Sequence, residues 1–195
     1  MRFRPTLIVL AAGQGSRFHG ADHKLEQPLA NGSVLGTTLR HAIETQLPVV
    51  VVTTERLAPM VTRQLARRDV VIVSDENAAR GMGHSIAAGV AERPSAAGWL
   101  ILPGDMPMVR PATLLTVAAA LEHHPVAYAQ HNGRRGHPVG FAAELYSELI
   151  MLNGDEGARR LVARYPACAA EVDDPGVLVD VDTVEDLAAV RAAGS

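Results

Sequence analysis

The chain is poor in cysteine and aromatic residues and has no excess of positive charge. Its one cysteine, Cys168, excludes an internal disulfide framework and a cysteine-rich metal site, and we expect a buried, inert thiol. The net charge of -3 makes nucleic acid and anionic membranes unexpected partners. The apolar run 7–12 is too short to cross a bilayer, and residues 1–5 lack a signal-peptide pattern. These absences predict a cytoplasmic protein that does not engage a membrane.

Apolar strands and amphipathic helices alternate through the first two-thirds of the sequence. The 195 residues, of which 48% are hydrophobic, suffice for one domain with a real core. Continuous apolar runs predict buried parallel strands at 7–12, 49–52, 70–73 and 99–102. Helical periodicity predicts helices at 34–47, 57–67, 83–93 and 111–123. Such βα units favour an α/β fold with a mostly parallel sheet and helices on both faces.

In the last third of the sequence, the regular alternation of predicted strands and helices ends. Asn132-Gly133, between the segments 126–130 and 138–141, predicts a hairpin-like excursion. We expect a helix over 155–165, with Asp155 as its N-cap, and further strands at 169–172 and 177–181. Thr183 and Asp186 have the spacing of a capping box and predict a final helix.

A glycine-rich turn, Leu10-Ala-Ala-Gly-Gln-Gly-Ser-Arg17, follows the first predicted strand. Gly13 and Gly15 permit positive φ angles and a close approach of the backbone to a ligand. Turn amides at the end of a strand form an anion site, and the cations Arg17 and Lys24 suit a triphosphate there. Because similar turns also occur without any ligand, this motif alone leaves a purely structural role open.

Two better-known phosphate motifs nearly match this turn and fail. A dinucleotide fingerprint needs a third glycine where Phe18 stands. A P-loop needs lysine followed by serine or threonine, where this chain has Ala21 and Asp22. An ordinary Rossmann dehydrogenase and a P-loop NTPase are therefore disfavoured.

Three aspartates occur where a metal site would be expected. Asp105 follows the predicted strand 99–102 in a turn stiffened by proline and glycine, a good position for a ligand of Mg²⁺. Asp180 and Asp182 are two residues apart on a predicted strand and so point the same way, so that one could complete the site while the other caps the next helix. The alternative is that all three only cap turns or lie on the surface.

The segment 77–85 supplies a second glycine-rich loop. Gly81 and Gly83 free the backbone beside a predicted helix start, and Ser85 adds a hydroxyl, so this loop could read the edge of a base. The alternative is a βα loop with Met82 in the core.

His137 and Arg159 complete the polar groups of interest. His137, before Pro138, could bind or exchange a proton with a second substrate, and Arg159 could reach a phosphate at a helix start. His19 and His23 have His-x₃-His spacing, but they lie in a predicted loop with no glutamate after the first histidine. Because the remaining histidines show no metal-like grouping, zinc is not expected.

The ordered set of motifs resembles the molybdenum cofactor cytidylyltransferase-like (MobA-like NTP transferase) family, a branch of the nucleotidyltransferases with a GT-A-like fold. The first loop with Lys24 carries the superfamily signature. The other matching segments are Gly81-Met-Gly-His-Ser85, Gly104-Asp-Met-Pro107, Gly136-His-Pro138, Gly154-Asp-Glu-Gly-Ala-Arg159 and Asp180-Val-Asp-Thr-Val-Glu-Asp186. They span nearly the whole chain. The resemblance implies one Rossmann-like, three-layer domain over 1–195, with a nucleotide-binding half (1–105) and an acceptor-binding, metal-completing half (106–195).

The resemblance also implies a reaction, in which Mg²⁺ or Mn²⁺ supports transfer of CMP from CTP to the phosphate of molybdopterin, with release of pyrophosphate. Arg17, Lys24 and Asp105 take the catalytic roles, and Asp180 or Asp182 joins Asp105 at the metal. The implied nucleotide-binding residues are Leu10, Ala11, Ala12, Gly13, Gln14, Gly15, Ser16, Arg17, Lys24, Asn77, Gly81, Met82 and Ser85. The implied acceptor-binding residues are His137, Pro138 and Arg159.

Ala12 favours CTP, because the GTP-using sister enzymes carry glycine at this position. Three alternatives remain: a GTP-using enzyme, a nucleotidyltransferase with another acceptor such as a sugar phosphate, and a regulatory or chaperone-like nucleotide-binding protein. The combination of Lys24, Asp105 and Asp180 or Asp182 disfavours the last, because binding alone needs fewer metal carboxylates. We expect a monomer or weak dimer, with a molybdoenzyme or its chaperone as a protein partner.

Overall fold

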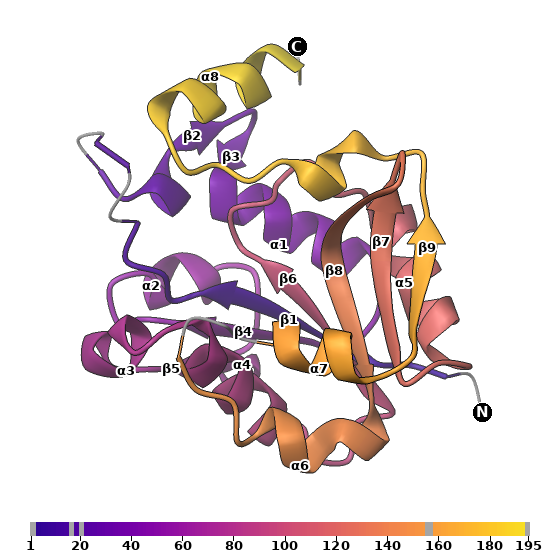
Figure 1. Cartoon of the computed structure of the whole chain (residues 1–195). Helices are drawn as coiled ribbons and strands as arrows, with labels where there is room; N and C mark the ends of the chain where they lie inside the picture. The colour runs from indigo at the N-terminus through magenta and orange to yellow at the C-terminus, as the bar shows by residue number, and fades with distance from the viewer. Residues whose placement is uncertain (1–2, 16–17, 20–21, 155–157, 194–195) are drawn as a thin grey trace.

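The computed structural model describes residues 3–15, 18–19, 22–154 and 158–193. Its strands are β1 (Thr6–Ala11), β2 (Pro28–Leu29), β3 (Gly32–Ser33), β4 (Val49–Thr53), β5 (Val70–Ile72), β6 (Gly98–Pro103), β7 (Val126–His131), β8 (Arg134–Ala142) and β9 (Ala167–Glu171). Seven of them form one sheet in the order β5-β4-β1-β6-β8-β7-β9, while β2 and β3 form a separate hairpin (Figure 1). Neighbouring strands of the large sheet are parallel except where β8 pairs with β6 and β7. The predicted α/β fold with a mostly parallel sheet is confirmed.

Helices cover both faces of this sheet. The α-helices are α1 (Val34–Glu44), α2 (Ala58–Val61), α3 (Asp75–Ala79), α4 (Met82–Ala91), α5 (Pro111–Leu121), α6 (Tyr146–Leu149), α7 (Arg159–Arg164) and α8 (Val184–Ala193). Short 3₁₀ segments are η1 (Lys24–Glu26), η2 (Arg67–Asp69), η3 (Ala143–Leu145) and η4 (Pro175–Leu178). Thr183 and Asp186 exchange hydrogen bonds at the start of α8, so the predicted capping box is confirmed.

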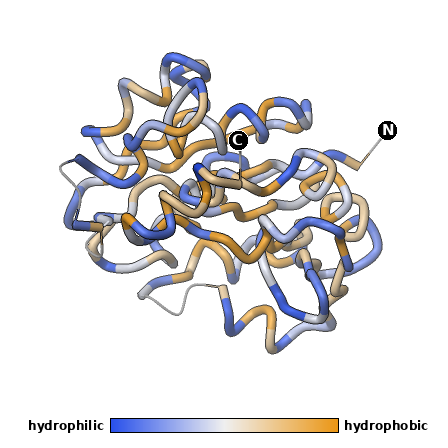
Figure 2. The backbone as a smooth tube through the Cα atoms, turned by 90° about the horizontal axis from the view of Figure 1, so that it is seen from above, coloured by the Kyte–Doolittle hydropathy of each residue, from blue (hydrophilic) through white to orange (hydrophobic). Residues whose placement is uncertain are grey.

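Alternating side chains of β1 build two hydrophobic cores. Leu7 and Val9 belong to the core that includes α1, α5 and α8, whereas Ile8 belongs to the core that includes α4, α6 and α7. This is the division expected for a strand buried on both faces, because successive side chains point to opposite sides. Figure 2 shows the apolar segments running through the interior, with hydrophilic backbone mostly toward the outside.

Gly89 lets α4 approach the sheet closely. A Cβ atom at this position would stand 2.7 Å from Ile8 Cγ2 and 2.9 Å from Val52 Cγ2. A larger residue would push α4 away from β1 and β4. The close packing matters for function, because the first turns of α4 carry Met82 and Ser85.

Two predicted elements are wrong. The helix predicted over 57–67 is only α2 and turns, because Pro59 opens a single turn and the Thr62 hydroxyl donates to the Ala58 carbonyl at 3.1 Å, which favours ending the helix. The strand predicted over 177–181 is the 3₁₀ segment η4 followed by irregular chain. Its backbone lies against Gly136 of β8 and hydrogen-bonds to the Asp105 carbonyl, but it joins neither of the two described sheets as a strand.

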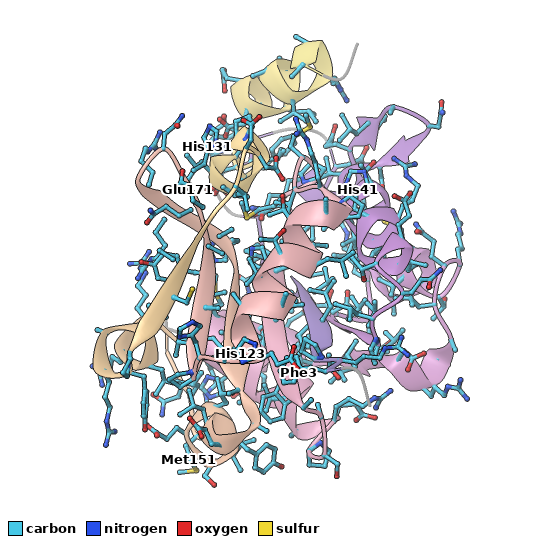
Figure 3. All side chains as sticks on the ribbon, turned by 90° about the vertical axis from the view of Figure 1, so that its right-hand side faces the viewer. Phe3, His41, His123, His131, Met151 and Glu171 are labelled. Carbon is cyan, nitrogen blue, oxygen red and sulfur yellow. The ribbon has the colours of Figure 1, made fainter. Side chains whose placement is uncertain are left out.

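The β7–β8 hairpin is confirmed, and β9 lies beside β7 at the edge of the sheet. Glu171, at the end of β9, lies near His131 of β7 (Figure 3). At this edge Cys168 is half-buried, so the expectation of a buried thiol is wrong. The helix predicted over 155–165 is helical from Arg159, and the N-cap proposed at Asp155 lies outside the described residues. In the described part of the chain no helix has the length and apolar character that crossing a membrane requires.

Asp174 fastens η4 to the start of α5. This carboxylate is 2% exposed and accepts hydrogen bonds from the Arg110 amide at 2.9 Å, the Thr113 hydroxyl at 2.6 Å and the Gly176 amide at 3.1 Å. Gly176 is needed beside it, because a Cβ atom there would stand 2.3 Å from the Met108 carbonyl oxygen. These contacts place the chain that follows η4 against the end of β6.

Replacing Asp174 tests this attachment. We expect Asp174→Ala to lower the free energy of unfolding by roughly 3 kcal/mol, because two amides and a hydroxyl lose a buried acceptor. Asp173→Ala is the matched control, since its side chain is exposed, and should change stability by less than about 0.5 kcal/mol. Urea denaturation measures both, and equal effects of the two substitutions would contradict the role of Asp174.

Candidate functional site

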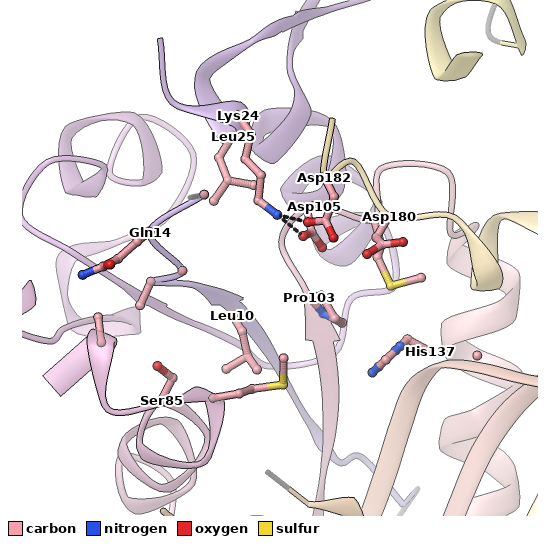
Figure 4. Close-up of a pocket in the computed structure, with 18 of the residues that line it drawn as sticks. Leu10, Gln14, Lys24, Leu25, Ser85, Pro103, Asp105, His137, Asp180 and Asp182 are labelled. Carbon is pink, nitrogen blue, oxygen red and sulfur yellow. Dashed lines mark hydrogen bonds and ion pairs between the residues drawn. The ribbon is translucent and has the colours of Figure 1, made fainter. Parts of the chain in front are cut away.

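A cavity of about 730 Å³ opens at the end of the large sheet where the central strands β1 and β6 terminate (Figure 4). The carboxyl ends of β1 and β6 reach it through Leu10 and Pro103. Because β8 runs antiparallel to β6, its amino end lies at this same edge and brings His137 into the wall. Ligands of open α/β sheets bind at this edge, so the topology itself selects this cavity.

The glycine-rich turn after β1 is held in place by His23. The Leu25 amide donates to His23 Nδ1 at 3.2 Å, which leaves Nε2 to donate to the Gly13 carbonyl at 3.0 Å. Burial lowers the pKa of His23, in keeping with this neutral tautomer. Gly15 has φ +63°, a conformation that side chains rarely adopt, and a Cβ there would contact the His23 ring at 3.5 Å. The sequence contained no signal for this role of His23.

Lys24 links two aspartates across the cavity. Its Nζ lies 2.6 Å from Asp105 Oδ2 and 2.7 Å from Asp182 Oδ1 (Figure 4). The Lys24 side chain is only 11% exposed. Burial by itself would lower the pKa of Lys24, but the charges and hydrogen bonds of Asp105 and Asp182 outweigh it and raise the pKa above its ordinary value. Lys24 therefore remains a cation at neutral pH.

Asp105, Asp180 and Asp182 form a carboxylate cluster at the end of β6. Each offers one oxygen such that these atoms lie within 4.8 Å of one another. Asp105 Oδ1 is buried, and no group in the described part of the chain donates to it. Burial, followed by the negative charges of Asp105 and Asp182, raises the pKa of Asp180. Carboxylate oxygens at this spacing fit a hard divalent cation. Such a cation would coordinate the unpaired Asp105 Oδ1 and reduce the repulsion among the three carboxylates.

A backbone hydrogen bond between distant segments contributes to the assembly of the cluster. The Val181 amide donates to the Asp105 carbonyl at 2.9 Å, so the residues flanking Val181 stand beside Asp105. Thr183 and Asp186 cap α8, and both Asp180 and Asp182 line the cavity. The expected division, with one aspartate at the metal and the other capping the helix, is therefore wrong.

The start of α4 forms the wall at the other end of the cavity. Gly81 has φ +109°. A Cβ on Gly83 would stand 2.8 Å from the backbone of Asn153. Met82 is 46% exposed and lines the cavity, so the alternative that buries it in the core is wrong. Ser85 lies on the same wall, on the side of the cavity where Leu10 lies (Figure 4).

His137 stands between the aspartates and a group of arginines. Burial lowers the pKa of His137, the positive charges of Arg135 and Arg159 lower it further, and the charge of Asp105 opposes them. The imidazole is therefore neutral at neutral pH and can donate through one nitrogen and accept through the other. The peptide bond that follows it, to Pro138, is cis.

Most of the residues singled out from the sequence come together here. Those on the cavity wall are Leu10, Ala12, Gly13, Gln14, Gly15, Lys24, Gly81, Met82, Ser85, Asp105, His137, Arg159, Asp180 and Asp182. Ala11, Asn77 and Pro138 are described by the structure but are not part of the wall. Ser16 and Arg17 lie outside the described residues.

Several wall residues were missed by the sequence analysis. Arg134 and Arg135 line the cavity beside His137, and Met106, Val177 and Leu178 form an apolar part of the wall. The spacing of Arg135 and His137 was the available signal, because residues two apart on a strand share a face. Nothing local marked the apolar residues, since η4 reaches the cavity only through tertiary packing.

The arrangement suits transfer of a phosphate-linked group. A glycine-rich turn and Lys24 can meet an anion, the carboxylates can hold a divalent cation, and the arginine side of the cavity can receive a second anionic molecule.

Known proteins are similar to this chain in sequence and in fold. The family model of the MobA-like NTP transferase domain matches residues 7–169. Purine catabolism protein PucB of Bacillus subtilis is 32% identical over 201 residues, covering 96% of each chain. Molybdenum cofactor cytidylyltransferase of Escherichia coli is 23% identical over 179 residues, covering 92% of this chain and 91% of that one. The crystal structure of Rv0371C from Mycobacterium tuberculosis in complex with manganese has a TM-score of 0.80 at 29% identity, covering 97% of this chain and 99% of that one.

The family match spans most of the chain and includes the turn after β1, the aspartate after β6 and the hairpin that carries His137. The nucleotidyltransferase chemistry of the family agrees with the cation, carboxylate and phosphate-binding features of the cavity. The chain therefore belongs to the MobA-like NTP transferase family and is a nucleotidyltransferase.

Proposed function

We propose that this nucleotidyltransferase transfers CMP from CTP to the phosphate of the molybdenum cofactor, with Mg²⁺ or Mn²⁺ as its metal. The carrying observation is the buried, unpaired Asp105 Oδ1 within a cluster of three aspartates, set beside Lys24 and the turn after β1. Two relatives support the choice of substrate and metal, one named a molybdenum cofactor cytidylyltransferase and one solved with manganese.

We assign the triphosphate to the turn after β1. The amides of 13–16 and the side chain of Arg17 would bind the β- and γ-phosphates, and Lys24 would meet the α-phosphate or the attacking phosphate. His23 keeps the turn in shape by binding the Gly13 carbonyl. A cradle of this kind is preorganised, so little reorganisation is needed when charge builds up during transfer.

We assign the metal to Asp105, with Asp180 or Asp182 as the second protein ligand. A bound Mg²⁺ or Mn²⁺ would neutralise phosphate charge on the donor nucleotide. Lys24 pairs with Asp105 and Asp182, so its positive charge offsets their negative charge beside the phosphates of the nucleotide.

The transfer itself needs positioning more than acid–base chemistry. An oxygen of the acceptor phosphate attacks the α-phosphorus of CTP and forms a new P–O bond. The bond from the α-phosphorus to the oxygen that bridges to the β-phosphate breaks, and pyrophosphate leaves with the electron pair. The acceptor oxygen is already deprotonated at neutral pH, so the protein mainly aligns the reactants and stabilises charge.

We assign the base to the wall formed by Leu10, Ala12 and the start of α4. Ser85 offers a hydroxyl for a hydrogen bond to a base edge, and Met82 offers an apolar surface. Gly81 would contribute the second lone pair of its carbonyl, which already accepts from the His84 amide at 3.2 Å. Asn77 does not line this wall, whereas the neighbouring Ala78 and Ala79 do. We therefore propose that this part of the loop contacts the nucleotide mainly through Ala78 and Ala79, with Asn77 behind them.

We assign the acceptor to the half of the cavity near His137 and Arg159, with Pro138 behind His137. The described geometry is also compatible with a different phosphate acceptor, such as a sugar phosphate. In either case we propose that the nucleotide binds mainly to residues 1–105 and the acceptor mainly to residues 106–195.

A substrate panel tests the proposal. CTP, GTP, ATP and UTP are each supplied with Mg²⁺ or Mn²⁺ and either molybdenum cofactor or a sugar phosphate, and pyrophosphate release is measured. We expect turnover with CTP alone. Turnover with GTP would contradict the choice of nucleotide, and turnover of CTP only with a sugar phosphate would contradict the choice of acceptor.

Asp105→Asn tests the metal assignment. We expect kcat to fall by at least about a hundredfold, because the substituted amide removes a charged metal ligand at the reacting phosphate. Asp173→Asn, an exposed carboxylate away from the cavity, is the control and should retain activity. Thermal unfolding confirms that both variants fold, and near-normal turnover by a folded Asp105→Asn protein would exclude the assigned role.

His137 makes the stability of the folded protein depend on pH, and the sign of this dependence can be predicted. Because burial lowers the pKa of His137 below its ordinary value of about 6.5, the unfolded chain binds more protons than the folded one below neutral pH. Stability is therefore greatest above the ordinary value and is lost as pH falls toward the folded pKa. We expect the Tm of His137→Gln to fall less than that of the wild type between about pH 7.5 and 5.5.

The exposed His123 provides the control for this measurement (Figure 3). His123→Gln should keep the pH dependence of the wild type. If His137→Gln also keeps it, the neutral, buried state of His137 is wrong.

A further inference from the structure

The turn after β1 is attached to the rest of the chain through a histidine ring. His23 Nε2 lies 3.0 Å from the Gly13 carbonyl oxygen. Within the described part of the chain, neither Gly13 nor Gln14 makes any other hydrogen bond. The direction of the peptide group between these two residues therefore depends on the His23 ring.

The element that carries this ring is fixed at three successive residues. His23 stands immediately before η1, in which Lys24 pairs with two aspartates of the carboxylate cluster and Leu25 is only 3% exposed. Glu26, the last residue of η1, accepts a hydrogen bond at 2.7 Å from Arg56 in the loop after β4. The segment η1 is therefore a firm support from which the ring can hold the turn.

The two nitrogens of the His23 ring have different partners and therefore different roles. The Leu25 amide, which can only donate, lies 3.2 Å from Nδ1. Nδ1 must therefore accept, and in a neutral imidazole the other nitrogen then carries the proton. The Nε2–H group consequently donates to the Gly13 carbonyl. One ring thus joins η1 to the turn through an acceptor on one side and a donor on the other.

The contact with the Gly13 carbonyl sets the direction of the Gln14 amide. Both groups belong to one planar peptide unit, in which C=O and N–H point to opposite sides. Gly13 and Gln14 line the cavity, whereas His23 does not. The ring therefore draws the carbonyl oxygen out of the cavity and directs the Gln14 N–H group to the opposite side, where an anion would bind.

Gly15 brings the same turn close to Lys24. A Cβ atom on Gly15 would lie 3.5 Å from His23 Nε2 and 3.4 Å from Lys24 Cγ. The turn therefore packs against two consecutive side chains, the ring of His23 and the aliphatic stem of Lys24. This packing sets the position of the turn amides relative to the Lys24 ammonium group, the other positive part of the triphosphate site.

We propose that His23 is a positioning residue for the donor nucleotide, whose ring holds the Gly13–Gln14 peptide with its N–H group toward the triphosphate. This inference rests on the proposed function and names the residue that controls the affinity of its triphosphate site. Without the ring, the glycine at 13 lets the peptide rotate. The carbonyl oxygen can then face the phosphates and repel them.

Two substitutions by amides separate the two bonds of the ring. In His23→Gln the side chain reaches about as far as Nε2, so its amide nitrogen can donate to the Gly13 carbonyl. In His23→Asn the shorter side chain places its oxygen near the position of Nδ1, so it can accept from the Leu25 amide but cannot reach Gly13. The two variants therefore keep opposite halves of the contact.

Inorganic pyrophosphate, a non-hydrolysable CTP analogue and CMP are titrated by calorimetry in the presence of Mg²⁺. We expect His23→Asn to weaken pyrophosphate and the CTP analogue by about fivefold to tenfold, the value of one lost hydrogen bond, and His23→Gln to stay within about twofold of the wild type. CMP lacks the β- and γ-phosphates, so its Kd should stay within about twofold in both variants.

His123→Asn is the matched control, because His123 is exposed, and it should bind all three ligands like the wild type. Circular dichroism and thermal unfolding verify that each variant folds. Wild-type affinity for pyrophosphate in both His23 variants, or equal weakening in both, would overturn the proposal. An equal loss of CMP by His23→Asn would also overturn it, because the substitution would then act on the whole site.

NMR of the wild type tests the geometry without any substitution. The ¹⁵N chemical shifts of an imidazole distinguish the nitrogen that carries a proton from the one that does not. We expect Nε2 of His23 to be protonated and Nδ1 to be unprotonated at neutral pH. The opposite tautomer would overturn the proposal, because a protonated Nδ1 cannot accept from the Leu25 amide.

Failure of the proposed function gives a different result from failure of this inference. Pyrophosphate carries no base, so its binding does not depend on the choice of CTP as donor. If the wild type binds pyrophosphate but prefers another nucleotide, the proposed donor is wrong, and a selective loss in His23→Asn still supports the role of His23. If CTP is the donor and both variants bind pyrophosphate normally, only that role is wrong. If the wild type binds neither pyrophosphate nor a nucleoside triphosphate, both are wrong.

Discussion

The ion pairs of Lys24 with Asp105 and Asp182 are the interaction on which the site depends. They join three segments that are far apart in sequence: η1, the end of β6 and the chain before α8. The backbone bond from Val181 to Asp105 brings the last of these segments into place. Without the ammonium group, the half-buried carboxylates of Asp105 and Asp182 would face each other and the exposed Asp180 with no compensating charge, at an electrostatic cost. The lysine therefore makes the cluster tolerable and keeps it ready for a divalent cation and phosphates.

Charge also divides the cavity into two parts. The turn after β1 with Lys24 faces the carboxylates, and the arginines of β8 and α7 surround His137 on the other side. The antiparallel strand β8 is essential to this division, because only its reversed direction brings its amino end to the edge where β1 and β6 terminate. An otherwise parallel sheet thus gains a second set of ligand-binding residues at its active edge. Nucleotide and acceptor can then meet above the end of β6.

Much of this could be predicted from the sequence, because some signals are local. The apolar runs 7–12 and 99–102 are buried strands, and the groups at their ends do meet at one edge of the sheet. The segment 177–181 has a similar apolar pattern, but its contacts are with Gly136 and the Asp105 carbonyl, which no local pattern reveals. Tertiary packing also explains why His23, whose partner is the Gly13 carbonyl, could not be found. The sequence motifs therefore indicated which residues line the site, whereas the hydrogen-bond partners that hold them in place depend on tertiary packing.

A crystal structure with Mn²⁺ and a non-hydrolysable CTP analogue would show whether Asp105 holds the metal at the nucleotide. We expect an anomalous manganese peak beside Asp105 Oδ1 and a phosphate oxygen of the nucleotide. We also expect the triphosphate along the turn after β1 and the cytosine against the wall that carries Ser85. A manganese peak away from Asp105, or a triphosphate bound by Arg135 and Arg159, would contradict these assignments.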